Sequence, residues 1–146
     1  LNATRPEGHF WLAANMGALA ESFGMRQGNK YRGQIKDALL MTLKLDPAFL
    51  DGSADRALGR WYFKVPGLFG GSNKQSEVHL RKSLTYNPNS IISHIFLAET
   101  LADMGRADDA RKEAQAAIDA PLDPNWTPED KRFKETAKRL LRDLQR

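Results

Sequence analysis

The chain contains 146 residues, of which 41% are hydrophobic and 27% are charged, with a formal net charge of +4. This length and apolar content suit a single domain, residues 1–146, that buries a continuous core. No cysteine is present, which excludes disulfides, thiolate metal sites and thiol nucleophiles.

Neither a membrane span nor a nucleic-acid surface is indicated. The longest apolar runs hold only a few residues, whereas a bilayer-spanning helix needs roughly 20. The densest basic stretch, 131–146, also carries Glu135 and Asp143 and spreads its charges around a helix, as a solvated helical face does. Because the chain opens at Leu1 rather than at a methionine, we expect a trimmed or processed segment, with any signal or anchor upstream.

Two helices are predicted in the first third of the chain. Residues 4–7 place a threonine before a proline and a glutamate, which is typical of a helix start. The second helix carries a stripe with the spacing i, i+4, i+7 and i+8, closed by a proline at i+12: Ile35, Leu39, Thr42, Leu43 and Pro47. Residues at this spacing share one helical face, and the proline disfavours further helix. Between Met16 and Ile35 we expect a long loop.

The same stripe returns in the middle of the chain, at Ser76, Leu80, Ser83, Leu84 and Pro88. Ser72 has the form of a helix cap, so we predict a helix from Asn73 to Tyr86, entered through a flexible glycine pair at 70–71. Its upstream partner contains Gly59. Glycine inside a helix costs about 1 kcal/mol relative to alanine, so Gly59 predicts a close helix crossing.

A third pair of helices and a closing helix follow. The third pair is marked by Leu97, Ala98, Leu101 and Gly105, then Ala110, Ala114, Ala117 and Ile118, with breakers at Pro121 and Pro124. Ala98 predicts a second close crossing. Residues 127–130 repeat the form of a capped helix start, and an apolar stripe from Phe133 to Leu144 predicts a C-terminal capping helix. The prediction is all-α: three antiparallel helical hairpins plus the capping helix, about seven helices and no sheet.

The spacing resembles the tetratricopeptide repeat, a 34-residue helical hairpin with small residues at its two crossing positions and a proline closing the second helix. The best match runs from Ile91 to Ile118. The earlier hairpins depart from it in their loops, and the loop between Tyr62 and Ser76 is longer than the motif.

A narrower resemblance rests on the segment 58–63, Leu-Gly-Arg-Trp-Tyr-Phe, followed by Pro66-Gly67 and by Phe69-Gly70-Gly71. It is similar to the helical T component of tripartite ATP-independent periplasmic (TRAP) transporters, and to the regulator of microtubule dynamics proteins of eukaryotes. The resemblance covers about Phe10 to Leu144. It implies a periplasmic lipoprotein that associates with the transporter's solute-binding subunit, although the lipobox cysteine of such proteins is not in this sequence.

No motif in the sequence indicates catalysis, a metal or a cofactor. His9, His79 and His94 lie on different predicted helices without a metal-binding spacing, so we interpret them as surface or packed side chains. The glycines at 67, 70 and 71 match neither the P-loop nor the dinucleotide fingerprint. We therefore expect no enzyme activity and no cofactor.

The repeat register predicts a concave groove lined by the first helix of each hairpin. Seven residues are expected to face it as a ligand or partner site: Arg56, Arg60, Phe63, Lys64, Ile92, Ile95 and Glu99. Arg56 and Arg60 lie one turn apart and are expected to attract an acidic group, with Phe63 beside them; a solvated pair without ligand is the equal alternative. Glu99 would neutralise only one of them. Most nearby aromatic side chains are expected in the core.

The sequence supports two alternative functions for the protein. The resemblance implies a non-catalytic binding or scaffold component of a periplasmic solute transport system, whose partner is the solute-binding subunit, a small acidic solute or an acidic peptide. The repeat alone supports a general protein-interaction scaffold that binds a peptide or a partner helix. The resemblance places the protein in the periplasm or outside the cell, with the cytoplasm as the alternative, and a homo-oligomer stays open.

Overall fold

The computed structural model describes residues 4–23 and 25–146, and the side chains of this part except those of residues 19–29. Over these ranges the chain forms seven α-helices and no strand: α1 Pro6–Phe23, α2 Met25–Leu45, α3 Ser53–Lys64, α4 Asn73–Tyr86, α5 Ile91–Asp103, α6 Ala107–Asp119 and α7 Thr127–Leu144. A 3-10 helix, η1 Gly67–Phe69, lies between α3 and α4.

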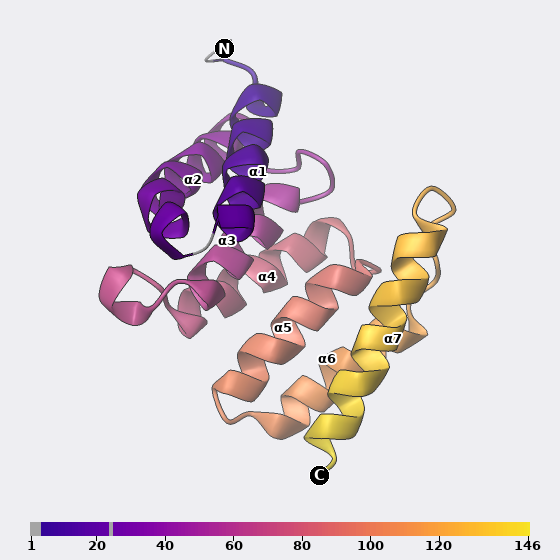
Figure 1. Cartoon of the computed structure of the whole chain (residues 1–146). Coiled ribbons are helices and arrows are strands. Elements are labelled where there is room, and N and C mark those ends of the chain that lie inside the picture. Colours follow the sequence, from indigo (N-terminus) through magenta and orange to yellow (C-terminus); the bar gives the residue numbers. More distant parts are fainter. Residues whose placement is uncertain (1–3, 24) are drawn as a thin grey trace.

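The helices pack as consecutive hairpins, α1 with α2, α3 with α4 and α5 with α6 (Figure 1). Contacts of α2 with α3 and of α4 with α5 join each hairpin to the next, and α7 covers α5 and α6. The predicted all-α array of helical hairpins is confirmed.

The loop predicted between Met16 and Ile35 is wrong. The first hairpin is built from the two long helices α1 and α2, which continue to Phe23 and resume at Met25. Gly17 and Gly33 lie inside them, and each costs about 1 kcal/mol relative to alanine. The pairing of α1 with α2, which is the most extensive helix contact in the described part of the chain, outweighs that cost because tertiary packing supplies most helical stability.

The crossing of α3 over α4 depends on Gly59. A Cβ atom added there would lie 2.5 Å from Leu80 Cγ and 3.2 Å from the carbonyl oxygen of Ser76. Leu58 and Leu80 are fully buried next to this crossing. The close approach predicted at Gly59 is therefore confirmed, and Ala98 is also fully buried, on α5.

The predicted cap is present at the start of α4 but not at the start of α7. The backbone N–H of Gln75 donates to Ser72 Oγ (3.2 Å), and α4 has the predicted bounds. Thr127 is not the cap of α7. The helix begins at Thr127 itself, whose hydroxyl donates to the carbonyl of Asp123 (3.0 Å), and Asp130 accepts from the Asp123 N–H (2.8 Å).

The last helix closes the array as predicted. Ala137 of α7 is fully buried against a cluster that contains Ile91, Ile95 and Ala117, with Phe133 packed on it. None of the helices in the described ranges combines the length and apolar character that crossing a bilayer requires.

Candidate functional site

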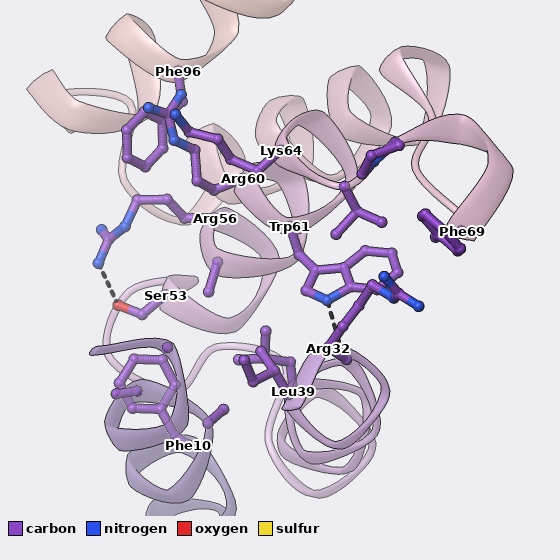
Figure 2. A pocket seen from close by; sticks show the side chains of 17 residues that line it. Phe10, Arg32, Leu39, Ser53, Arg56, Arg60, Trp61, Lys64, Phe69 and Phe96 are labelled. Atoms are coloured by element: carbon purple, nitrogen blue, oxygen red, sulfur yellow. Dashed lines mark hydrogen bonds between the residues drawn. The ribbon is translucent and has the colours of Figure 1, made fainter. Parts of the chain in front are cut away.

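A pocket of about 600 Å³ opens beside α3, between the first hairpin and α5 (Figure 2). Its walls are mostly apolar, with a few cations and one hydroxyl. The apolar lining consists of Phe10, Ala13, Ala14, Gly17, Ile35, Leu39, Ala57, Trp61, Val65, Pro66, Phe69 and Phe96. The polar lining consists of Arg32, Ser53, Arg56, Arg60 and Lys64.

Helical spacing on α3 creates the cationic side of the pocket. Arg56, Arg60 and Lys64 follow one another at intervals of four residues and therefore share a face. The opposite face of the helix carries Leu58 and Gly59, which are buried in the core. Leu58 packs with Ala38 and Leu39 of α2, and Gly59 lies against Leu80 of α4, so the cations are left on the side of the pocket.

Trp61 forms the central apolar surface. Its ring is largely buried, and the indole Nε1–H donates to the carbonyl oxygen of Arg32 (2.9 Å), which fixes the ring against α2. The guanidinium of Arg32 lies 4.3 Å from the centre of the Phe69 ring. This contact holds the loop after α3 against the first hairpin. Figure 2 shows Trp61 between Arg56 on one side and Phe69 on the other.

Arg60 is engaged by the third hairpin. Its guanidinium forms an ion pair with Glu99 of α5 and lies 4.2 Å from the centre of the Phe96 ring. The centre of the Phe63 ring lies 5.2 Å from the same guanidinium. The charge of Arg60 is thus compensated within the protein, as the sequence allowed for one of the two arginines.

Among the described residues, the hydrogen-bond partner of Arg56 is a hydroxyl group and not a carboxylate. Its Nη2 donates to Ser53 Oγ (3.1 Å), whereas none of the carboxylates whose side chains the structure describes lies within ion-pair distance of it. Burial lowers the pKa of Arg56 below its ordinary value, although the more distant charge of Asp51 opposes this. Arg56 therefore presents a partly buried cation at the pocket.

The predicted groove residues separate into three groups. Arg56, Arg60 and Lys64 line the pocket, with Lys64 exposed at its edge. Phe63 and Glu99 lie outside the lining and contact Arg60. Ile92 is partly buried and does not line the pocket, and Ile95 is 3% exposed. Placing Ile95 on the groove was wrong, because α6 and α7 enclose that face of α5 in the core.

Sequence reasoning missed most of the apolar lining. Arg32 lies within the segment for which a loop is predicted. Phe10 and Trp61 belong to a set of aromatic side chains of which most are expected in the core and one or two at a groove or contact surface. Phe96 comes from the next hairpin, and only its spacing of one turn from Ile92 and Glu99 could have suggested it. Phe69 belonged to a recognisable loop, but its position over the first hairpin depends on the contact with Arg32.

The remaining titratable pairs lie away from the pocket. His79 Nδ1 lies 2.8 Å from Asp55 Oδ1, and His94 Nδ1 lies 2.7 Å from Glu113 Oε2. Burial lowers the pKa of His94, but hydrogen bonds to Glu113 and to the carbonyl of Pro88 more than offset this, so the pKa is raised. No cluster of three metal-binding side chains occurs in the described ranges.

A comparison of the sequence with protein families identifies the class of the chain. The family model described as "TRAP transporter T-component" matches residues 8–146. No curated protein matches the chain. Since the match includes nearly the whole chain, from the start of α1 to the end of α7, the resemblance carried by the segment 58–71 is confirmed, and this chain belongs to the TRAP transporter T-component family.

Proposed function

We propose that the protein is a non-catalytic, periplasmic accessory component of a TRAP transporter, which binds the solute-binding subunit and holds a solute in the pocket beside α3. Family membership supports the role in transport. The pocket carries the proposal of a binding function, because its volume of about 600 Å³ and its apolar walls with few polar groups are typical of small-molecule sites.

The chemistry of the lining supports binding rather than catalysis. Among the described side chains Ser53 is the one hydroxyl of the lining, and its Oγ donates to the Leu50 carbonyl (2.5 Å) while it accepts from Arg56. A serine nucleophile needs an adjacent base, and arginine does not serve as one. The lining includes no histidine or carboxylate in the part of the chain that the structure describes.

Exposed apolar side chains beside the pocket support a protein partner. Leu68, at the tip of the loop after α3, is 89% exposed and adjoins Phe69 of the lining. Trp11 is 54% exposed and adjoins Phe10. Exposed apolar surface near a ligand pocket is a common feature of interaction sites. A partner that docks on both side chains would lie across the first hairpin and the loop.

A general peptide-binding scaffold has less support. An extended peptide would need a groove that continues along α5, but Ile95 is buried there and Ile92 lies outside the pocket. The pocket ends on α5 at Phe96. This geometry favours a compact solute together with a docked subunit.

The test is a calorimetric titration of the protein with the solute-binding subunit of a TRAP transporter from the same organism. We expect saturable binding that is weakened at least about tenfold by the combined changes Trp11→Asp and Leu68→Asp, since apolar contacts of this size dominate interfaces. Val78→Asp is the matched control, because Val78 is 52% exposed on α4 and does not line the pocket. Absence of binding by the unaltered protein would overturn the proposed partner.

A further inference from the structure

We propose that the tip of the loop between α3 and α4, residues 67–70, is a gate on the pocket, and that the docked subunit opens it. Phe69 closes one end of the pocket while its ring lies on Arg32, and a partner that draws Leu68 outward releases that ring. This inference rests on the proposed function, because it names how access to the same pocket is regulated. It is carried by the different surroundings of the neighbouring side chains Leu68 and Phe69.

The base of this loop is fixed. The carbonyl oxygen of Pro66 accepts hydrogen bonds from the backbone N–H groups of Phe69 (2.9 Å) and Gly71 (3.1 Å), so the loop closes on itself. A Cβ atom at Gly71 would lie 1.6 Å from the carbonyl oxygen of Val65, the residue that follows α3. The base is therefore packed tightly against the end of α3, and a movement of the loop is confined to its tip.

The tip has few contacts with the rest of the molecule. Its central element, η1, packs extensively on none of the helices that the structure describes. Leu68 is 89% exposed and Phe69 is 47% exposed. A Cβ atom at Gly67 would meet nothing within 4 Å. Segments with so little packed surface open locally at a small cost in free energy.

A cation–π contact holds the tip over the pocket. The guanidinium of Arg32 on α2 lies 4.3 Å from the centre of the Phe69 ring. Figure 2 shows Phe69 at one end of the site, beyond Trp61 and close to the side chain of Arg32. Contacts of this kind are weak at exposed positions. The contact can therefore keep the tip closed and still break when a partner competes for the tip.

The geometry of η1 couples the outer side chain of the tip to the inner one. Leu68 and Phe69 are consecutive residues of a 3-10 helix, in which successive side chains lie about a third of a turn apart. A partner that holds Leu68 therefore cannot turn the tip without moving Phe69. Because an outward turn adds the Phe69 ring to the apolar surface that the partner covers, docking favours the open position.

A neutral apolar dye, Nile red, measures access to the pocket by stopped-flow fluorescence, because its emission rises when it leaves water. Phe69→Ala is expected to raise both the association and the dissociation rate constants at least about threefold, as expected when a cation–π contact is lost. A residue that only forms the wall would change the dissociation rate alone. An association rate that is unchanged or lowered in Phe69→Ala would overturn the gate.

The matched control is Ile35→Ala. Ile35 lines the same pocket from α2 and lies outside the loop. This change is expected to raise the dissociation rate and to leave the association rate within about twofold, since lost contacts act mostly on dissociation. Cooperative urea unfolding establishes that both variants are folded. An equal acceleration of association in the control would show a general loosening of the pocket and would overturn the gate.

The coupling is measured with saturating solute-binding subunit of a TRAP transporter from the same organism, and the subunit with Nile red alone serves as the blank. The docked subunit is expected to raise the association rate of the dye at least about threefold in the unaltered protein and to add nothing in Phe69→Ala, where the gate is absent. Subunit binding without acceleration would overturn the inference and leave the proposed partner standing.

Two further outcomes separate the inference from the proposed function. A subunit that does not bind in calorimetry would overturn the proposed partner and the coupling, while Phe69→Ala, measured without the subunit, still decides whether the tip is a gate. Failure of Nile red to bind the unaltered protein would overturn the solute pocket and the gate together.

Discussion

Arg60 of α3 and Glu99 of α5 form an ion pair that joins the second hairpin to the third and compensates one cation at the edge of the pocket. Both side chains are less than one-third exposed, at 27% and 29%. The stack of Arg60 on Phe96 adds a second contact across the same boundary. The pair therefore acts on the packing of the hairpins as well as on the charge of the pocket.

Breaking this pair should cost little stability but should change the charge of the pocket. We expect Glu99→Gln to lower the free energy of unfolding by up to about 1 kcal/mol, as for other partly exposed pairs. A double-mutant cycle with Arg60→Met, measured by urea unfolding, isolates the coupling. A coupling energy of zero would show that the two charges do not interact in solution.

Leucine at position 59 should disrupt the crossing of α3 over α4. Even a Cβ atom would lie 2.5 Å from Leu80 Cγ, so Gly59→Leu is expected to cost about 3 kcal/mol or more by overpacking. The matched control is Gly33→Ala, since nothing lies within 4 Å of a Cβ there. It should stabilise α2 by up to about 1 kcal/mol. Equal urea midpoints for the two variants would contradict the crossing geometry.

Overpacking should also follow from a larger side chain at position 98. Ala98 is fully buried on α5 beside the equally buried Leu97. We expect Ala98→Leu to lower the free energy of unfolding by about 1–3 kcal/mol. Thermal unfolding followed by circular dichroism measures this change, and an unaltered melting temperature would indicate that α5 is packed more loosely.

The stability of the third hairpin should fall as the pH rises above about 6.5, the ordinary pKa of histidine. Both ring nitrogens of His94 face acceptors, Glu113 and the Pro88 carbonyl, so the protonated ring is favoured and its pKa is raised. A raised folded-state pKa contributes stability fully below about 6.5, the unfolded value, and loses it as pH rises through the folded value. Arg81, at 3.8 Å from Glu113, reduces this effect.

An NMR titration of the His94 ring tests this directly. The measured pKa should lie above 6.5 in the unaltered protein and fall in Glu113→Gln, which removes the ion pair but keeps an acceptor. Urea midpoints at pH 6 and pH 8.5 should differ less in that variant. A His94 pKa at or below the ordinary value would contradict the structure.

Several features of the fold could be predicted because their causes are local. The cap at Ser72 and the proline at position 88 set the ends of the fourth helix within a few residues of themselves. Gly59 indicated a crossing because a helix rarely keeps a glycine without a packing reason. The same local logic failed between Met16 and Ile35, where the contact between α1 and α2 outweighs the glycines.

The sequence by itself determined the helices from α3 onward and the stripe of cations on α3, since spacing along a helix decides which side chains share a face. Only the tertiary structure decided what each of those side chains meets. Ile95 is buried because α6 and α7 cover it, and Arg60 is compensated because Glu99 arrives from another hairpin. Arg56 has no ion-paired carboxylate among the side chains that the structure describes. These outcomes depend on contacts between residues far apart in the chain, and helical periodicity carries no information about such contacts.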